Sequence, residues 1–514
     1  MAEQKSVKRE SLVRGLGLLD ATTIVVGSMI GSGIFITSAA SARMVGSPGW
    51  LLAAWAIAGV LTLTGAAACA ELATMMPRAG GQYVFLREAY NPAVGFLFGW
   101  SLFLVIQTGT IAAVAIGFAK FMGVLTGSVS STNYIVRPVV LGRYALSLST
   151  QQLVAILVIL LLTFTNTLGL KAGKLIQNTF TFTKTAALVG LILVGLTLGW
   201  KVGLGSGAAA FTSSWWNPWA NGWSPEKAQT DVGAVGALAL VLLLGRAMVG
   251  PLFAQSAWNN VTFTGSEVRD PGRNLPRALL IGCACVVALY LLANLAYVMT
   301  LPLASIQGAP QDRVATSTMQ AILGAPGTVI MALAIMVSTF GCDNGLILAG
   351  ARVYYAMARD GLFFRSVAKV NERHVPAVAL VAQGLWAALL TLPRTVKPTV
   401  RPGEDPFGDV YTQLLEYIVS ADLIFYVLMV AAVIVMRRKS PQAERPYRTP
   451  AYPLVPIVYL VIALLLVADL AYLTPWSSGI GYLIVLTGIP VYLVWRRGAV
   501  RHSVDESETA GVGD

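Results

Sequence analysis

Charged residues are scarce in this chain of 514 residues, because Asp, Glu, Lys and Arg together make up only 12% of it. A soluble globular protein carries roughly a quarter charged residues. This shortage argues against an ordinary soluble fold. The 56% share of hydrophobic residues indicates instead a protein surface that contacts lipid.

Histidine and cysteine are also rare, which weakens the case for an enzyme. The histidines are His374 and His502, and the sequence has neither a paired-histidine metal motif nor a phosphate-binding glycine loop followed by Lys and Ser or Thr. We therefore expect no enzymatic activity, no metal and no cofactor. A channel is not favoured either, because no filter motif is present. The cysteines form no zinc or disulfide pattern and all lie in apolar stretches: Cys69, Cys283, Cys285 and Cys342.

Long apolar runs are abundant. A helix that crosses a bilayer needs about 20 consecutive apolar residues. By that measure we predict an all-α polytopic membrane protein of about twelve helices, joined by short loops into one domain. The predicted spans are 17–45, 50–75, 93–124, 150–168, 175–199, 234–266, 277–301, 325–358, 376–393, 411–436, 454–474 and 478–496.

The basic residues explain the formal net charge of +12 without any nucleic acid. With the N-terminus inside, 24 of the 36 Lys and Arg residues lie in or beside cytoplasmic segments and 9 lie on the outer side. The remaining 3 lie within spans. Under the positive-inside rule, this asymmetry predicts a multi-pass protein of the cell (inner) membrane with both ends in the cytoplasm.

The chain ends are polar and too short to fold on their own. We expect residues 1–14 and 498–514 to be disordered cytoplasmic tails that flank a membrane domain of residues 15–497. The segment after residue 14 is too long for a signal peptide and has no clear cleavage site.

Two of the predicted spans contain residues that weaken a helix near mid-depth. Gly27, Gly31 and Gly33 cost the first span roughly 2–3 kcal/mol relative to alanine. In the sixth span, Pro251 removes a backbone donor. If each half has five spans, these breaks occupy the first position of both halves. Such matched breaks indicate a substrate site in an inverted-repeat transporter, whereas a lone glycine cluster is more often a packing notch.

The residues around both breaks resemble a known family. Gly31-Ser32-Gly33-Ile34-Phe35 is similar to the first-helix signature of the amino acid–polyamine–organocation (APC) superfamily. The segments 253–259 and 267–276 resemble the sixth helix and following loop of its L-type amino acid transporter branch, especially the bacterial members. Further matches are found at 77–83, 344–345, 352, 358–361 and 445–447.

The resemblance implies a sodium-independent transporter or exchanger of amino acids, with neutral L-amino acids favoured, that works by alternating access. It also implies a 5+5 inverted repeat over about 17–199 and 234–436, with two further helices at about 454–496. The animal carriers attach a heavy-chain partner through a cysteine after the third span. The corresponding stretch, 127–150, has no cysteine, so we expect no disulfide-linked heavy chain.

An amino acid zwitterion needs an anion site and a cation site, and the broken helices offer both. Backbone amides around Ser32, Gly33 and Ile34 would receive the carboxylate at the positive end of a helix dipole. Carbonyls around Phe253, Ala254 and Ser256 would accept from the ammonium group. In the resembling family, the aromatic residue at position 253 closes over the substrate, so Phe253 is the predicted gate. The full predicted set of substrate-binding residues is Ile30, Gly31, Ser32, Gly33, Ile34, Phe253, Ala254, Gln255, Ser256 and Asn344.

The resemblance also assigns a role to a lysine deep in the fifth span. L-type carriers place a lysine where sodium-coupled relatives hold their ion, and Lys184 matches that position. Its ammonium group would donate to first-span carbonyls and to the hydroxyls of Ser338 or Thr339. A fixed positive charge there would repel sodium.

Several alternatives stay open at this stage. The carrier could instead be a proton-coupled symporter of amino acids, amines or polyamines, with Asp343 as the proton carrier. Charged residues within spans are functional candidates by default. The pattern assigns no role to Arg246, Glu416 or Asp422, and it does not indicate the substrate or the oligomeric state.

Overall fold

The computed structural model describes residues 15–168, 170–211, 214–228, 232–371, 375–397 and 405–510, without side chains for 170–178 and 496–510. The predicted tail 1–14 and the last four residues therefore lie outside the described part. The predicted tail 498–514 begins within a helix that continues to Ala510.

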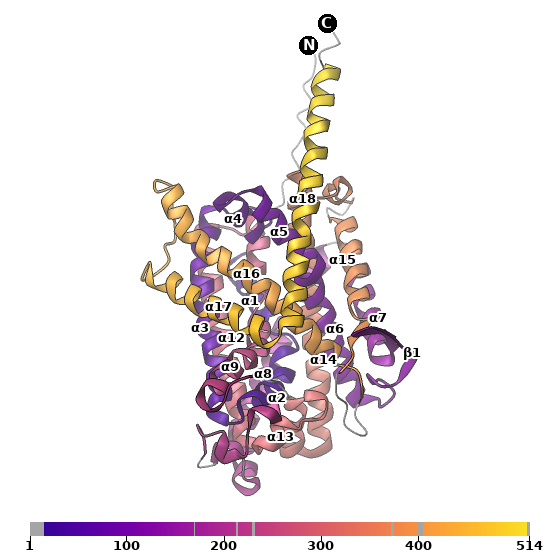
Figure 1. Ribbon diagram of the computed structural model, residues 1–514, viewed down its shortest axis with the longest axis vertical. Coiled ribbons are helices and arrows are strands. Elements are labelled where there is room, and N and C mark those ends of the chain that lie inside the picture. The colour runs from indigo at the N-terminus through magenta and orange to yellow at the C-terminus, as the bar shows by residue number, and fades with distance from the viewer. Residues whose placement is uncertain are drawn as a thin grey trace.

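Helices form most of the described chain (Figure 1). The longer ones are α1 (Leu18–Met29), α2 (Gly33–Val45), α3 (Pro48–Met75), α5 (Pro92–Ser101), α6 (Gln107–Leu125), α7 (Thr150–Thr167), α8 (Leu170–Ser206), α9 (Gly236–Ala247), α12 (Pro271–Thr300), α14 (Val314–Arg359), α15 (Ala377–Leu390), α16 (Val410–Lys439), α17 (Leu454–Leu473) and α18 (Pro475–Ala510). The short ones are α4 (Gln82–Ala89), the π-helical turn η1 (Leu102–Ile106), η2 (Ala209–Phe211), η3 (Trp219–Asn221), η4 (Pro225–Ala228), α10 (Val249–Ala254), α11 (Asn260–Phe263), η5 (Gly265–Glu267), α13 (Leu303–Gln307), η6 (Pro310–Asp312) and η7 (Arg365–Ala368).

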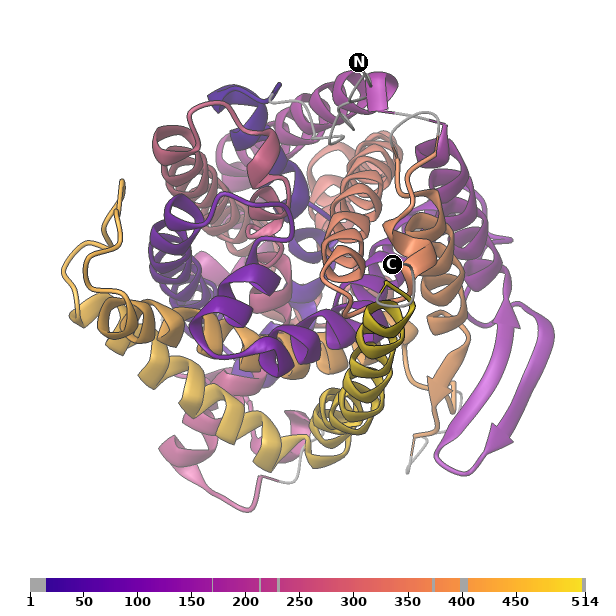
Figure 2. The same ribbon diagram turned by 90° about the horizontal axis from the view of Figure 1, so that it is seen from above.

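The predicted membrane character of the fold is confirmed. Within the described residues, 10 helices are long and apolar enough to cross a bilayer, or up to 11 if the bent pair α1–α2 is counted as one span. The shorter apolar helix α15 lies where the predicted ninth span was placed. Figure 2 looks along the bundle and shows these helices packed side by side.

The predicted break in the first span is present. Helix α1 ends at Met29, α2 begins at Gly33, and the two helices are bent by 42°. The backbone is non-helical at Ile30, which caps α1. Helices of only 12 and 13 residues are marginal on their own, so their neighbours in the bundle stabilise the bent geometry.

The predicted break in the sixth span, within 250–259, is present in the second half of that segment. It consists of α9, α10 and α11, and its non-helical stretch is Gln255–Asn259 rather than the turn that contains Pro251. Pro251 lies in the first turn of α10, where its missing N–H would have had no intrahelical acceptor. Ala257 has a φ of 64°, so the chain passes through the left-handed region inside this break.

A small antiparallel sheet was not predicted. Strands β1 (Tyr134–Leu141), β2 (Tyr144–Ser149) and β3 (Pro393–Thr395) pair in the order β1-β2-β3. The two-residue turn between β1 and β2 begins with Gly142 at a φ of 66°, as primed hairpin turns require. The sequence signal is the run of β-branched residues in β1, which is too short for a span.

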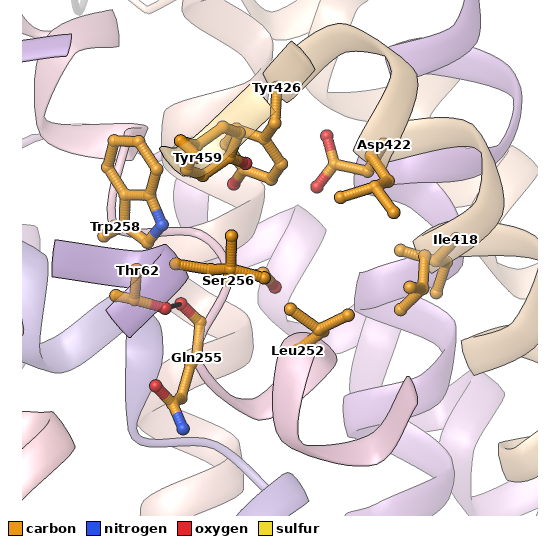
Figure 3. Close-up of a pocket in the computed structure, with 12 residues that line it drawn as sticks. Thr62, Leu252, Gln255, Ser256, Trp258, Ile418, Asp422, Tyr426 and Tyr459 are labelled. Atoms are coloured by element: carbon orange, nitrogen blue, oxygen red, sulfur yellow. Dashed lines mark hydrogen bonds between the residues drawn. The ribbon is translucent and has the colours of Figure 1, made fainter. Parts of the chain in front are cut away.

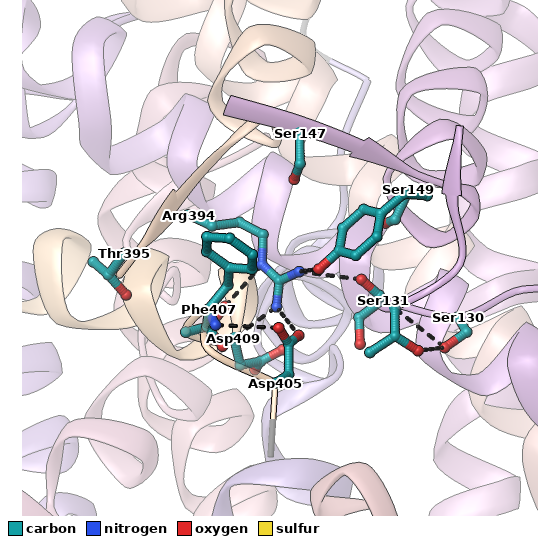
Figure 4. Close-up of polar contacts among 12 residues, drawn as sticks. Ser130, Ser131, Ser147, Ser149, Arg394, Thr395, Asp405, Phe407 and Asp409 are labelled. Carbon is teal, nitrogen blue, oxygen red and sulfur yellow. Dashed lines mark hydrogen bonds and ion pairs between the residues drawn. The ribbon is translucent and has the colours of Figure 1, made fainter. Parts of the chain in front are cut away.

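Arg394 ties this sheet to the start of α16 (Figure 4). Its guanidinium group forms an ion pair with Asp405 at 2.6 Å and donates to the carbonyls of Ser131 and Gly408 at 3.1 and 3.0 Å. Because the side chain is only 3% exposed, the pair is shielded from water. The sheet is thereby fixed beside the α6 end of the bundle.

Packing around the first break positions the candidate site. Helix α1 contacts α8, α12 and α14, and α2 contacts α9, α10, α13 and α14. In Figure 1, α4 and the end of α18 lie at one end of the bundle, and α2 and α13 lie at the other. The first break therefore joins a half-helix near one membrane surface to a half-helix near the opposite surface.

Candidate functional site

The carbonyls at the end of α1 are bound by side chains of the surrounding helices. A helix leaves its last four carbonyls without an intrahelical donor. Here four side chains donate to these carbonyls. Lys184 Nζ of α8 donates to the Gly27 carbonyl, and Tyr290 Oη of α12 donates to the Met29 carbonyl at 2.9 Å. From α14, Cys342 Sγ donates to the Ser28 carbonyl at 3.4 Å and Ser338 Oγ donates to the Ile30 carbonyl at 3.5 Å. These contacts hold α1 against α8, α12 and α14.

The amides at the start of α2 have no such partners. Among the described residues, nothing accepts a hydrogen bond from the N–H groups of Ser32, Gly33 and Ile34. They lie at the positive end of a 13-residue helix. Free donors combined with a helix dipole favour an anion, such as a carboxylate. The Ser32 hydroxyl is held aside by a 3.0 Å hydrogen bond with the Tyr411 hydroxyl.

Gly33 makes room for a neighbouring helix rather than for a ligand. A Cβ placed on Gly33 would lie 2.6 Å from the Ala254 Cβ and 2.9 Å from the Ala254 Cα. Real Cβ atoms do not approach so closely, so the glycine permits α2 to contact α10. The missing side chain of Gly33 therefore faces Ala254.

The break in the sixth span supplies two free acceptors. The Phe253 carbonyl, which we expected to be free, accepts from the Ser256 N–H at 3.1 Å and from its hydroxyl at 2.7 Å. No donor in the described part of the chain reaches the carbonyls of Ala254 and Ser256. Because α10 touches α2 at Gly33, free acceptors on one break lie close to free donors on the other.

Phe253 is packed against a tyrosine that bridges both breaks. Its ring is 6% exposed and meets the Tyr411 ring edge to face at 6.1 Å. The Lys120 ammonium lies 5.2 Å from the centre of the same tyrosine ring and pairs with Asp409 at 2.8 Å. This contact lowers the pKa of the Asp409 carboxyl despite its burial. Sequence reasoning missed Tyr411, because a tyrosine at the start of a span carries no motif of its own.

The far side of Tyr411 borders a pocket between α2, α9, α10 and α16. Arg246 and Glu416 both line this pocket, and their charged groups are 3.6 Å apart. Two residues without a predicted role are thus brought together as an ion pair. Tyr411 thus contacts the first break through Ser32, packs against Phe253 and borders this pocket.

If Phe253 is a gate, then Phe253→Ala slows turnover more than it weakens binding, because a gate acts on occlusion of the bound substrate. We expect the maximal exchange rate in proteoliposomes to fall roughly tenfold, with less than a threefold change in the half-saturating concentration. Phe164→Ala is a matched control, because Phe164 is 62% exposed on α7. An unchanged maximal rate for Phe253→Ala would leave the ring with a packing role only.

Lys184 is buried with 0% exposure, and its ammonium group donates to the Gly27 carbonyl. Its predicted hydroxyl partners are bonded elsewhere. Ser338 donates to the Ile30 carbonyl, and Thr339 donates to the Ile335 carbonyl of its own helix at 2.9 Å. The expected lysine–hydroxyl bonds are therefore corrected, because within the described residues Lys184 Nζ donates to the Gly27 carbonyl and to neither hydroxyl. Lys184 and Ser338 still hold the same segment of α1 from two helices.

Two neighbouring residues of α14 face different surroundings. Asn344 accepts from Asn166 Nδ2 of α7 at 2.8 Å, so its side-chain oxygen is engaged by α7, and its role in the substrate site stays a prediction. Asp343 is fully buried, and neither of its carboxylate oxygens has a hydrogen-bond partner within the described residues. Successive helical residues point about 100° apart, which explains why one span contributes to two environments.

Gln255 is turned toward α3 rather than toward the first break. Its Nε2 donates to the Trp55 carbonyl at 3.1 Å, and the Thr62 hydroxyl donates to the Gln255 carbonyl at 3.4 Å. The remaining predicted residues of the site, Ile30 and Gly31, lie in the turn between α1 and α2. A Cβ on Gly31 would lie 3.1 Å from Cys342 Sγ.

Comparisons with known proteins identify the family of this chain. A family model described as amino acid permease matches residues 16–494. The large neutral amino acids transporter small subunit 2 of mouse is 30% identical over 489 residues, which cover 94% of this chain and 81% of the relative. The human b(0,+)-type amino acid transporter 1 is 28% identical over 495 residues, covering 96% and 90%. The human Asc-type amino acid transporter 1 is 28% identical over 517 residues, covering 98% and 87%.

Proposed function

Because the chain belongs to the amino acid permease family, we propose that it is a sodium-independent exchanger of L-amino acids, with neutral ones as its main substrates. The observation that carries this proposal is the pairing of two breaks. Free amides of Ser32, Gly33 and Ile34 adjoin free carbonyls of Ala254 and Ser256. This arrangement offers donors to a carboxylate and acceptors to an ammonium group, which are the two charged groups on the α-carbon of an amino acid.

Sodium independence rests on Lys184. Its ammonium group, with no exposure to solvent, donates to the last turn of α1. A second cation within a few ångströms would be repelled strongly in a low-dielectric interior. The Lys184 ammonium group therefore binds first-span carbonyls in place of a sodium ion.

Alternating access is the proposed mechanism, with the two five-span repeats moving relative to each other. On one side, the Phe253–Tyr411 contact would open to the pocket that contains Arg246 and Glu416. On the other, ion pairs join α14 to η5 and α16 to α3: Arg352 with Glu267 at 2.7 Å and Arg437 with Glu71 at 2.8 Å. Opening that side requires these pairs to separate.

The deciding experiment is uptake of labelled leucine into proteoliposomes that are either empty or preloaded with unlabelled leucine. We expect uptake only into preloaded vesicles, with no change when choline replaces sodium. Uptake that collapses without sodium would contradict sodium independence, and equal uptake into empty vesicles would contradict obligatory exchange. A protein that neither binds nor moves any amino acid would contradict the whole proposal.

A proton-coupled symporter is the second candidate, and Asp343 favours it. Burying an unpaired carboxylate is costly, and a bound proton offsets that cost. In this case, an inward proton gradient would drive uptake into empty vesicles. Asp343→Asn would retain exchange but lose the response to the gradient.

The proposed setting is the cell membrane with both ends in the cytoplasm, as the Lys and Arg asymmetry favours. We also propose a carrier without a disulfide-linked heavy chain. Within the described residues, all four cysteines are free, and Cys69, Cys283 and Cys342 are buried.

A further inference from the structure

One face of the β1–β2 hairpin is aliphatic and points away from the bundle. Residues directly opposite each other in an antiparallel pair point to the same side of the sheet. On this side the register pairs Val136 with Leu148, Val139 with Leu146, and Leu141 with Tyr144. We call the aliphatic members the outward face, and its most exposed residues are Val139 at 58% and Leu141 at 59%. A continuous exposed apolar surface marks a site of interaction with another protein or with a membrane.

The opposite face of β2 consists of small residues that pack on the protein. Ala145, Ser147 and Ser149 alternate with the outward residues, and all three are buried. Ser149 accepts a hydrogen bond from the Gln152 N–H at 3.2 Å, and in Figure 4 Ser147 points toward Arg394. An antiparallel sheet with one face in water has the reverse pattern, with apolar residues inward and polar residues outward. The outward face therefore suits an apolar surrounding rather than water.

The hairpin lies at the flank of the bundle, where lipid surrounds the helices. It joins the end of α6 to the start of α7, so it lies where two spans reach the same membrane surface. In Figure 1, β1 lies beside α7 and not beyond the end formed by α2 and α13, and Figure 2 shows both strands at the perimeter. The neighbouring surface of α7 is also apolar, since Leu157, Leu161 and Phe164 are exposed there.

The charges of the hairpin are all positive. The segment 127–150 contains Arg137 and Arg143, both exposed, and no Asp or Glu. The Arg143 guanidinium group lies 4.6 Å from the centre of the Trp476 ring at the start of α18. Trp476 Nε1 donates to the Tyr144 hydroxyl at 3.2 Å. Tryptophan and tyrosine are enriched where hydrocarbon meets headgroups, and basic residues there attract anionic lipids.

We propose that the β1–β2 hairpin is a membrane anchor that binds anionic phospholipid. The outward face enters the boundary between headgroups and acyl chains, and Arg137 and Arg143 bind the phosphate groups. Apolar burial combined with basic residues is the arrangement by which interfacial segments hold anionic membranes.

The anchor is separate from the candidate substrate site. The hairpin contributes no residue to the pocket that Tyr411 borders. It contributes none either to the pocket between the sixth-span break, α3, α16 and α17, which Figure 3 shows. Changes to the outward face therefore leave the contacts around both breaks in place, and the inference does not depend on the proposed function.

A second copy of the chain is the competing occupant, because β1 is the edge strand of its sheet. The charges argue against it. Two copies paired along β1 would bring Arg137 and Arg143 of both chains together, and segment 127–150 has no acidic residue to compensate them. An anionic lipid supplies the missing charge.

The first test measures the depth of the outward face in nanodiscs that hold one copy of the full-length protein. Cys285 is the exposed cysteine, so Cys285→Ala provides the background, and Val139→Cys carries an environment-sensitive fluorophore. We expect phosphatidylcholine with brominated acyl chains to quench this label at least about twofold. Glu226→Cys is the matched control, because Glu226 is exposed on η4, and its label should be quenched much less.

The second test measures the preference for an anionic headgroup. At equal mole fractions, brominated phosphatidylglycerol should quench the label at position 139 more strongly than brominated phosphatidylcholine. The combined change of Arg137→Gln and Arg143→Gln should abolish this preference. Lys227→Gln is the control, because Lys227 is an exposed basic residue of η4, and this variant should keep the preference. Monodisperse elution in size-exclusion chromatography confirms that each variant folds.

Three results would overturn the anchor. Quenching at position 139 no stronger than at position 226 would place the outward face in water. Equal quenching by both headgroups would remove the anionic lipid. Disulfide formation between two copies of the Val139→Cys variant in liposomes would identify a second copy as the occupant. Because none of these measurements uses transport, a failed anchor leaves the proposed function standing, and a failed function leaves the anchor standing.

Discussion

Replacing Gly33 by alanine is expected to reduce amino acid exchange to background, although the change adds a single methyl group. The new Cβ would lie 2.6 Å from the Ala254 Cβ, so α2 and α10 must move apart. Overpacking in a close-packed interior costs roughly 1–3 kcal/mol. The displaced elements here carry the free amides and the free carbonyls, so the substrate loses both of its anchors at once. Labelled leucine binding to the purified variant and exchange in proteoliposomes both measure the effect.

A second substitution separates this clash from other causes of failure. In the double variant Gly33→Ala with Ala254→Gly, the larger residue is moved from one helix to the other, and a substantial part of the activity should return. Gly190→Ala is the matched control, because a Cβ on this helical glycine of α8 meets nothing within 4 Å. Normal binding by a well-folded Gly33→Ala protein would contradict the close contact between the breaks.

Replacing Lys184 by alanine is expected to lower the exchange rate by at least about tenfold. The change removes the donor to the Gly27 carbonyl and leaves a buried acceptor without a partner, which costs about 1–3 kcal/mol. It also breaks the direct link between α8 and the last turn of α1. Since these helices must move together for the site to change sides, the rate suffers more than the binding of leucine. Initial rates of exchange, compared with leucine binding, separate the two effects.

Lys201→Ala is the control for a lysine of the same helix, because Lys201 is exposed. Its rate should equal that of the unmodified protein. If Lys184→Ala exchanges leucine at the normal rate, the ammonium group does not couple α8 to α1. If the unmodified protein requires sodium, Lys184 does not replace an ion either.

The two breaks were predictable because they depend on local chemistry. Glycines at 27, 31 and 33 weaken the helix wherever it lies, and a bent break is found at that place. The position of the second break was predicted less closely. Pro251 is tolerated in the first turn of a helix, so the unwound stretch begins only after Ala254. Local propensity thus indicated that a break exists, while its exact bounds depended on the neighbouring turns.

The orientation of individual side chains could not be predicted in the same way. Asn344 was placed in the substrate site, but it accepts a hydrogen bond from Asn166 on α7. Thr339 was placed beside Lys184, but it donates to its own helix. In a span that is apolar on all sides, the hydrophobic pattern does not reveal which face points to the centre of the bundle.

The amino-acid sequence by itself determined the membrane character of the chain, the approximate places of its spans, and the two breaks, since each follows from composition or from residues close together in the chain. Only the tertiary structure decided what fills those breaks. It placed Ala254 against Gly33, Tyr411 beside Ser32, and Asp422 in a pocket with Trp258. These partners lie more than 150 residues apart, and their contacts depend on how helices rotate and cross when they pack, which no local pattern records.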